Sequence, residues 1–399
     1  MAGRKFFAGK QLKIMNIIVN SLPLTGILTG IARYVRNLYR SLESFQALKI
    51  GYFTGRACSQ HMPVQDGGGS WLIKNGRIRC LPDSALFAMR CIHWLDYERR
   101  LRSTVRRKGY DIYHETGFVP ARVPELPVVY TLYDLSLRRF AHTHPRERVW
   151  FFEHFVKSRI FRTAHILTIS EYIRREIMEE FRIPPEMVTA VPLAPDPHFF
   201  PRSGTQVRRV LSRLGIPDDY LLFTGTLEPR KNIDLLIKAL PLLRHDVTLV
   251  LVGWSGWGDK SWNQSLIRDG LDARVIQVGY VDEEDLACLY SGAKVFIYPS
   301  LYEGFGLPVL EAMACGCPVI VSRSSSLPET ASHAAVYTDP FDPEELARQI
   351  DSLLEDEALR HRLGQEGITH ASKYCWSRTA AGTLNVFRNV LNTGKSRRV

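Results

Sequence analysis

The sequence predicts an α/β protein of two domains, each built on a doubly wound parallel sheet. Three observations favour this fold class. Short apolar runs rich in β-branched and aromatic residues alternate with helical patterns, as in open sheets with crossover helices. The 399 residues exceed the usual content of one hydrophobic core. Prolines crowd the stretch 192–201, which is typical of a linker between domains.

The first domain is predicted to cover residues 1–200. Its expected strands are apolar runs that suit a buried parallel sheet and end at turn or polar residues. They are 13–20, 48–53, 111–114, 128–132, 166–169 and 188–191.

The second domain is predicted to cover residues 201–375, and residues 376–399 form a C-terminal segment of their own. The expected strands of this domain are 220–225, 248–253, 274–279, 293–298 and 318–322. The C-terminal segment contains a helical pattern over 376–391 and ends in a basic tail.

The stretch 300–311 combines two acids with a glycine turn and the start of a helix. The apolar run 293–298 leads to Glu303, a Gly-Phe-Gly turn follows at 304–306, and Glu311 lies about two turns into the next helix. Unpaired N–H groups and the dipole at a helix N-terminus favour phosphate, and glycine lets the backbone come close. Carboxylates accept paired hydrogen bonds from vicinal hydroxyls. Together these features predict a site for a nucleotide sugar.

A purely structural interpretation of the same residues stays open. Glu303 could cap the helix and Glu311 could be a solvated helix residue, since glutamate is usually exposed. The combination of both acids with the phosphate-binding turn favours the ligand site.

Two basic residues follow the first strand of the second domain. Arg230 and Lys231 lie in a short loop after Gly225, where a planar guanidinium and a mobile ammonium could clamp a diphosphate. The alternative is a pair of solvated loop residues.

In the first domain, two features lie at the carboxyl ends of expected strands, where ligands of open α/β sheets bind. Gly30 belongs to a permissive loop before a helix, and His114 ends the run 111–114. A lone glycine motif is a weak signal, and a lone histidine is more often structural.

The run from Glu303 to Glu311, through Gly304-Phe305-Gly306-Leu307-Pro308, resembles the paired-glutamate motif of the retaining glycosyltransferases of family 4. The segments 223–232, 278–281, 285–286 and 327–329 follow that family in order and spacing, and 24–34 and 130–135 do so more loosely. The resemblance covers nearly the whole chain. It implies the GT-B fold, in which two Rossmann-like domains enclose a cleft and a C-terminal helix crosses back to the first domain.

The resemblance also implies a role for each matching residue. The expected catalytic residues are Glu303, Arg230, Lys231 and His114. Glu303 would hold the hexose hydroxyls, Arg230 and Lys231 would bind the diphosphate, and His114 would contact the hexose. Glu311 would hold the ribose diol, and the base would contact the backbone near Tyr280 and Val281. The full donor site would comprise Gly225, Thr226, Gly304, Phe305, Gly306, Leu307, Glu311, Tyr280, Val281 and Gly30.

The implied reaction is transfer of a hexose from a nucleoside diphosphate sugar to a hydroxyl, with retention and without a metal. No Asp-x-Asp triplet occurs, so the usual Mg²⁺ anchor of the other large transferase fold is missing, and the cationic pair can replace it. The loop 225–232 resembles bacterial mannosyltransferases of O-antigen type. GDP-mannose is therefore the expected donor, with UDP- and dTDP-sugars left open, and a lipid-linked glycan or oligosaccharide is the expected acceptor.

The basic charge lies in the first half of the chain. Residues 1–200 hold 30 Lys and Arg against 17 Asp and Glu, whereas the rest holds 22 against 24. In the segment 146–162, arginines and lysines alternate with aromatic residues, which fits a helix on an anionic membrane surface. The alternative is an internal helix with solvated charges. No nucleic-acid-binding motif accompanies the charge.

We expect a cytoplasmic protein, peripheral on the inner face of the cell membrane. The seven cysteines lack the spacing of redox or zinc motifs, which indicates reduced thiols. Polar residues interrupt the apolar run 12–31, so neither a signal peptide nor a spanning helix is expected there.

Two other functions stay open. One is a transferase of the same fold that acts on a soluble acceptor. The other is a sugar-nucleotide-binding protein with weak or no catalysis, because Ala32, Tyr133 and Thr226 stand where relatives often carry glycine, histidine and arginine.

Overall fold

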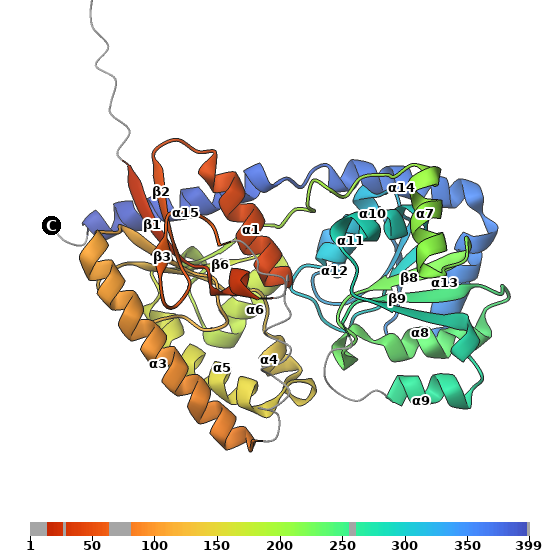
Figure 1. Cartoon of the computed structure of the whole chain (residues 1–399), viewed down its shortest axis with the longest axis horizontal. Helices are drawn as coiled ribbons and strands as arrows, with labels where there is room; N and C mark the ends of the chain where they lie inside the picture. The colour runs from red at the N-terminus through yellow and green to blue at the C-terminus, as the bar shows by residue number, and fades with distance from the viewer. Residues whose placement is uncertain (1–13, 27–28, 64–80, 255–260, 397–399) are drawn as a thin grey trace, which may run out of the picture.

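The computed structural model describes residues 14–26, 29–63, 81–254 and 261–396, which form two parallel-sheet domains side by side (Figure 1). In the described residues, the sheet of the first domain has seven strands in the order β3-β2-β1-β4-β5-β6-β7. Neighbouring strands are parallel except for β2 and β3. The strands are β1 (Met15–Asn20), β2 (Leu48–Phe53), β3 (Cys58–Ser59), β4 (Ile112–Glu115), β5 (Val128–Thr131), β6 (His165–Thr168) and β7 (Val188–Ala190).

The described part of the second domain contains a sheet of six parallel strands in the order β10-β9-β8-β11-β12-β13. The strand order reverses between β8 and β11, and ligands of open α/β sheets bind at the carboxyl ends of such strands. The strands are β8 (Tyr220–Thr224), β9 (Thr248–Val252), β10 (Val275–Gly279), β11 (Val295–Tyr298), β12 (Val319–Ser322) and β13 (Val336–Thr338).

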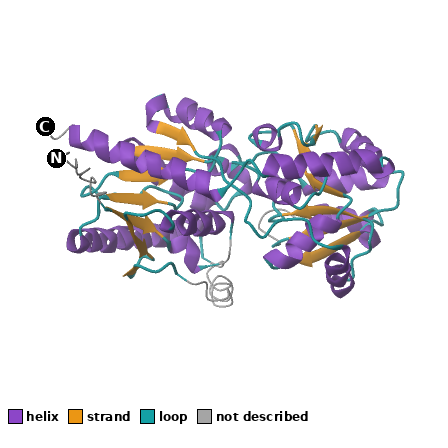
Figure 2. Ribbon diagram, turned by 90° about the horizontal axis from the view of Figure 1, so that it is seen from above, coloured by secondary structure: helices purple, strands orange, loops and turns teal. Residues whose placement is uncertain are grey.

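Helices cover both faces of each sheet (Figure 2), so the predicted doubly wound α/β fold is confirmed. Those of the first domain are α1 (Gly30–Glu43), α3 (Asp83–Lys108), α4 (Ser136–Arg139), α5 (Arg146–Arg159) and α6 (Glu171–Phe181). The remaining helices are α7 (Gly204–Leu214), α8 (Ile233–Ala239), α9 (Ser261–Arg268), α10 (Glu283–Gly292), α11 (Leu307–Ala314), α12 (Leu327–Ala331), α13 (Pro343–Glu355), α14 (Glu357–Ala371) and α15 (Trp376–Ser396). Among the described helices, none is both long and apolar enough to span a bilayer.

The strands differ from the predicted ones mainly at the sheet edges. Each predicted strand exists, although Lys13, where the first was expected to begin, lies outside the described residues. The strands β3 and β13 were not predicted. They are two and three residues long, too short for a periodic pattern, and pairing with a neighbour defines them.

The C-terminal helix α15 returns from the second domain to the first and packs against α1 (Figure 1). Thr379 Oγ1 donates to the carbonyl of Pro192 at 2.8 Å. A Cβ at Gly382 would lie 3.2 Å from a methyl group of Val191, so the glycine allows a close approach.

The two domains also contact each other through loops. Ser170 Oγ donates to the carbonyl of Gly304 at 2.7 Å. The carboxylate of Glu329 accepts hydrogen bonds from the backbone N–H groups of Glu171 and Tyr172, at 2.8 and 2.9 Å, and so caps the start of α6 from the other domain. The domains therefore meet at the predicted glycine turn.

Candidate active site

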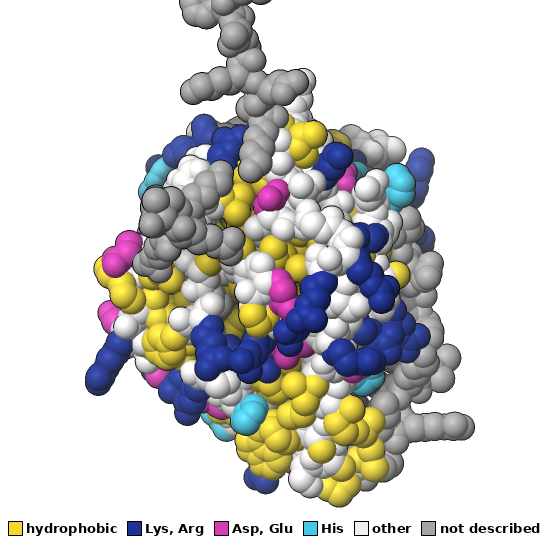
Figure 3. Space-filling model, turned by 90° about the vertical axis from the view of Figure 1, so that its left-hand side faces the viewer, with side chains coloured by type: hydrophobic (Ala, Val, Ile, Leu, Met, Phe, Trp, Pro, Cys, Tyr) yellow, Lys and Arg dark blue, Asp and Glu magenta, His cyan; other side chains and the backbone are white. Residues whose placement is uncertain are grey.

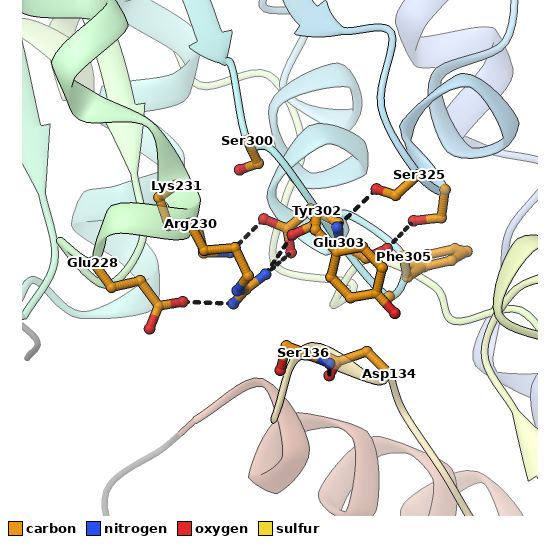
Figure 4. Close-up of polar contacts among 12 residues, drawn as sticks. Asp134, Ser136, Glu228, Arg230, Lys231, Ser300, Tyr302, Glu303, Phe305 and Ser325 are labelled. Carbon is orange, nitrogen blue, oxygen red and sulfur yellow. Dashed lines mark hydrogen bonds and ion pairs between the residues drawn. The ribbon is translucent and has the colours of Figure 1, made fainter. Parts of the chain in front are cut away.

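Glu303, Arg230 and Lys231 form a buried charged cluster beyond the ends of β8 and β11 (Figure 4). Lys231 Nζ lies 2.5 Å from Glu303 Oε1, and Arg230 Nη1 lies 3.3 Å from Glu303 Oε2. Lys231 Nζ also donates to the hydroxyl of Tyr298 at 2.7 Å. The alternative of solvated loop residues is therefore wrong for Arg230 and Lys231.

The loop after β8 is held by Asn232, through its backbone conformation and its side chain. Arg230 and Lys231 lie in a 3-10 turn, and Asn232 after it takes the left-handed conformation with φ 59°. Asn232 Nδ2 donates to the carbonyls of Pro299, at 3.1 Å, and Pro340, at 2.7 Å. The basic loop is thereby tied to the chain that leads from β11 to Glu303.

Charge pairing compensates for the burial of these groups. Burial acts to raise the pKa of Glu303, but Lys231 and Arg230 outweigh it and lower that pKa to about 2. Burial opposes the charge on Arg230, yet Glu303 and Glu228 raise its pKa. Burial lowers the pKa of Lys231, with Glu303 acting against it. Glu303 is a carboxylate at neutral pH, so it can accept hydrogen bonds from hydroxyls but has no proton to donate.

The turn after Glu303 needs its glycines. Gly306 has φ 94°, and a Cβ there would lie 2.6 Å from a methyl group of Leu327. A Cβ at Gly304 would lie 2.4 Å from the carbonyl oxygen of Tyr133 in the first domain. Leu307 begins α11 directly after the turn, so the N-terminus of this helix follows Glu303 by four residues in the sequence.

Glu311 is buried within α11 and is paired across the domain boundary. Its Oε1 lies 2.9 Å from Arg33 Nη1, on α1 of the first domain, and its Oε2 is 3.4 Å from the hydroxyl of Tyr290. Burial raises the pKa of Glu311, and Arg33 opposes that shift. The interpretation of Glu311 as a solvated helix residue is wrong, because the residue is only 1% exposed.

Comparisons with known proteins agree with this geometry. Residues 28–199 match the model of Glycosyltransferase Family 4, and residues 212–370 match that of glycosyl transferases group 1. The chain is 33% identical over 384 residues to the O-antigen chain mannosyltransferase B of Escherichia coli, covering 94% of this chain and all of that protein. The chain belongs to the GT-B glycosyltransferases of family 4.

Solved structures show the same fold at lower identity. A sucrose-phosphate synthase from Thermosynechococcus elongatus has a TM-score of 0.73 and 20% identity, over 95% of this chain and all of that one. The Anabaena protein HepE, in complex with UDP and glucose, has a TM-score of 0.69 and 20% identity, over 94% of this chain and all of that one. At 20% identity, these two structures support the GT-B fold of the chain and nothing further about it.

Several predicted donor residues of the transferase line the ends of its second sheet. Gly225 has φ 145°, and its carbonyl would be 2.0 Å from a Cβ at Gly253, so both strand ends pass very close. Thr226 follows, and its carbonyl accepts a hydrogen bond from Glu228 N at 2.9 Å. The ring of Phe305 is buried and packs against another aromatic ring of the core, so a donor could meet only its backbone.

Tyr280 and Val281 lie at the edge of the same region. Tyr280 is 60% exposed, whereas Val281 is buried. Tyr280 borders a shallow surface cavity of ≈350 Å³, together with His198, Asp282, Glu283 and Glu284. Arg33 connects this edge to Glu311, the residue expected to hold the ribose. Its Nε lies 3.5 Å from Glu283 Oε1, and its Nη1 lies 2.9 Å from Glu311 Oε1.

The structure does not bring His114 to the charged cluster. The strand β4 ends one residue later than expected, at Glu115, and His114 is fully buried. Its Nδ1 lies 2.8 Å from the hydroxyl of Tyr39, and its Nε2 lies 2.8 Å from Thr131 Oγ1. Burial lowers its pKa to about 3. The expectation that His114 faces the donor hexose therefore finds no support in its contacts, which are those of a neutral core histidine.

Gly30 is exposed at the start of α1, and a Cβ there would meet no atom within 4 Å. The protein itself does not require glycine at this position. Close approach of the donor to Gly30 stays a prediction.

Sequence reasoning missed several residues of the site. Arg33 and Glu228 were not assigned roles, and Glu228 Oε1 accepts from Arg230 Nη2 at 2.5 Å. The hydroxyl of Tyr302 accepts from Leu135 N at 3.0 Å and donates to Glu176 Oε2 at 2.5 Å, which joins the two domains. The positions of Tyr302 and Glu228, close to Glu303 and Arg230 in the sequence, could have indicated them. Arg33 belongs to the segment 24–34 that loosely resembles the family, but nothing in that segment indicated its pairing with Glu311.

One trio of side chains among the described residues has the spacing of a metal site. The ligand atoms of Asp196, His198 and Glu283 all lie within 4.8 Å of one another. Arg36 Nη2 lies 2.8 Å from both carboxylates, so a guanidinium already balances their charge.

The aromatic residues of the segment 146–162 divide between the core and the surface, and Phe161 is exposed. Phe152 and Phe155 on α5 are buried, and the guanidinium of Arg159 lies 4.3 Å from the centre of the Phe155 ring. Trp150 is exposed. The helix α5 therefore has one face in the core and one exposed face, and a membrane contact of the exposed face stays a prediction.

The neighbouring helix α3 carries an exposed apolar stripe. Met89, Ile92 and Leu95, each three residues apart, are exposed, while Trp94 and Tyr97 on the inner face are buried. The C-terminal half of α3 holds the basic residues Arg99, Arg100, Arg102, Arg106, Arg107 and Lys108. Figure 3 views the end of the first domain, where basic side chains gather in a band above an apolar area.

Proposed function

We propose that the transferase moves mannose from GDP-mannose to a hydroxyl of a lipid-linked glycan at the cytoplasmic face of the membrane, with retention of the anomeric configuration. The observation that carries the proposal is the buried cluster of Glu303, Arg230 and Lys231 beside the start of α11. The identity to an O-antigen chain mannosyltransferase supports mannose as the sugar.

The cluster suits a donor bound by its diphosphate. Arg230 and Lys231 would contact the phosphate oxygens, with the N–H groups of Gly306 and Leu307 at the helix N-terminus. Both cations are paired in the structure, but Lys has three donors and Arg has five, so each can share its charge with a phosphate. Glu303 would accept hydrogen bonds from the hexose hydroxyls, and Glu311 from the ribose diol.

Transfer then requires one bond to form and one to break. The acceptor oxygen bonds to the anomeric carbon, the bond from that carbon to the diphosphate oxygen breaks, and the acceptor proton passes to the departing diphosphate. Arg230, Lys231 and the helix N-terminus would stabilise the charge that develops on the leaving group. Because these fixed positive charges supply what a Mg²⁺ ion supplies elsewhere, we propose that no metal is required.

Glu311→Ala tests this function. The variant should lose donor binding, because the ribose diol would lose its carboxylate partner. GDP should raise the melting temperature of the wild type by several degrees, but it should hardly change that of Glu311→Ala. A panel of GDP, UDP and dTDP identifies the base. Wild-type transfer of radioactive mannose from GDP-mannose should survive EDTA.

Glu366→Ala serves as the control: Glu366 is half-buried on α14, lies 4.0 Å from Arg362 on the same helix, and should respond to GDP like the wild type. Strict dependence on a divalent metal, or no response of the wild type to any nucleoside diphosphate, would contradict the proposal.

The stripe of Met89, Ile92 and Leu95 on α3 supports a membrane-bound acceptor. Apolar residues beside a basic half-helix can insert at the interface while each nearby Lys or Arg adds on the order of 1 kcal/mol of attraction to anionic lipid. The wild type should co-sediment with phosphatidylglycerol vesicles at physiological salt, and Ile92→Ser/Leu95→Ser should reduce binding about tenfold or more. Unchanged binding, or none by the wild type, would favour a soluble acceptor.

A further inference from the structure

The first-domain loop 133–136 lies directly against the second-domain turn that contains Gly304 (Figure 4). A Cβ at Gly304 would lie 2.4 Å from the carbonyl oxygen of Tyr133 and 3.2 Å from Asp134 Cβ. Leu135 N donates to the hydroxyl of Tyr302 at 3.0 Å. Asp134 is thereby held beside the donor residues, although it comes from the opposite domain.

The carboxylate of Asp134 has one oxygen engaged and one available. Its Oδ1 accepts from Ser136 N at 2.8 Å and closes the turn before α4. Its Oδ2 accepts no hydrogen bond from any residue that the structure describes. The side chain is partly exposed, so a ligand in the space between the domains can reach it.

Asp134 also lies within electrostatic reach of the diphosphate clamp. Burial acts to lower the pKa of Arg230, but the charges of Glu303, Glu228 and Asp134 together raise it. The residues assigned to the donor hexose and diphosphate, Glu303, Arg230 and Lys231, all belong to the second domain. An acceptor must therefore approach the anomeric carbon from the first-domain wall, where Asp134 stands.

We propose that Asp134 binds the acceptor, through a hydrogen bond from the attacking hydroxyl to its free oxygen. This assignment rests on the proposed function. A carboxylate accepts a hydrogen bond from an alcohol strongly, and it turns a lone pair of that alcohol toward the anomeric carbon. The proton itself leaves with the diphosphate, as in the step described above, so Asp134 returns unchanged.

Asp134→Asn separates this role from a structural one. The amide oxygen of asparagine can still accept from Ser136 N, so the turn is kept, but the amide nitrogen cannot accept from an alcohol. With GDP-mannose as donor and octyl α-mannopyranoside as the acceptor probe, we expect kcat/KM for the acceptor to fall about 10- to 100-fold. GDP binding and slow hydrolysis of the donor without acceptor should stay at wild-type values.

Two further variants make the outcome unambiguous. Asp342→Asn is the control, because Asp342 Oδ1 also accepts a backbone hydrogen bond, from Glu345 N at 2.7 Å, as the N-cap of α13. It should transfer like the wild type. Asp134→Ala loses both carboxylate oxygens. If the role of Asp134 were purely structural, transfer should fall in Asp134→Ala but not in Asp134→Asn.

Wild-type transfer by Asp134→Asn would overturn the assignment and leave the proposed function intact. A wild-type protein that neither binds GDP nor transfers mannose would overturn both.

Discussion

Lys231→Met is expected to reduce mannose transfer at least 1000-fold, on the order expected for losing a fixed positive charge at a leaving group together with the position of Glu303. It should also destabilise the fold. Lys231 Nζ lies 2.5 Å from Glu303, and methionine leaves that buried carboxylate with Arg230 alone, at 3.3 Å. Leaving a buried charge without its partner costs about 3–5 kcal/mol. Thermal unfolding and a transfer assay measure the two effects.

The double variant Lys231→Met/Glu303→Gln separates these effects. Removal of the Glu303 charge, which Lys231→Met leaves with Arg230 alone, should recover most of the lost stability, whereas transfer should stay at least 1000-fold below the wild type. If Lys231→Met kept a rate within tenfold of the wild type, the assignment of Lys231 to the diphosphate would be wrong.

The same pair should appear in the acid stability of the wild type. Burial acts to raise the pKa of Glu303, but Lys231 and Arg230 outweigh it and lower the pKa from 4.5 to about 2. Its contribution to stability is therefore present above pH 4.5 and is lost as the pH falls toward 2. Lys231 is the main group that lowers the pKa of Glu303, so in Lys231→Met this contribution should be smaller and its loss should be complete at a higher pH.

Gly304→Ala is expected to abolish transfer while sparing the nucleotide site. The new Cβ would lie 2.4 Å from the carbonyl oxygen of Tyr133, a backbone atom of the other domain, so the domains must separate to relieve the clash. We expect kcat to fall at least 100-fold, because the second domain, which would hold the donor, and the first domain, which would hold the acceptor, can no longer come together. Binding of GDP, measured by calorimetry, should change less than threefold.

Gly204→Ala is the control for this variant. A Cβ at Gly204, at the start of α7, would have its nearest neighbour 3.4 Å away, at the end of the Arg208 side chain. It should act like the wild type. Small-angle scattering should show a larger radius of gyration for Gly304→Ala alone, and equal radii with full activity would refute the role of this contact in closure.

Much of the fold could be predicted because it is encoded locally. The buried strands are continuous apolar runs bounded by turn residues, and the helix starts carry their own capping residues, such as Ser203 at α7 and Asp282 at α10. The edge strands β3 and β13 escaped prediction because only pairing with a neighbouring strand defines them.

The candidate site was only partly visible in the sequence. The glycine turn, Glu303 and Glu311 lie within nine residues of one another, so their spacing on strand, turn and helix could be interpreted directly. His114 differs from the expectation because β4 continues to Glu115, so the histidine lies within the strand, against Tyr39 and Thr131, rather than in the loop beyond it.

The sequence by itself determined the two-sheet architecture and the glycine turn between Glu303 and Glu311, because periodicity and turn chemistry depend on residues close together in the chain. The family followed from the resemblance of that motif. Only the tertiary structure decided that Arg33 pairs with Glu311, 278 residues away, and that Asp134 lies against the turn at Gly304. Such contacts depend on how two separately folded domains dock, and no local pattern records that geometry.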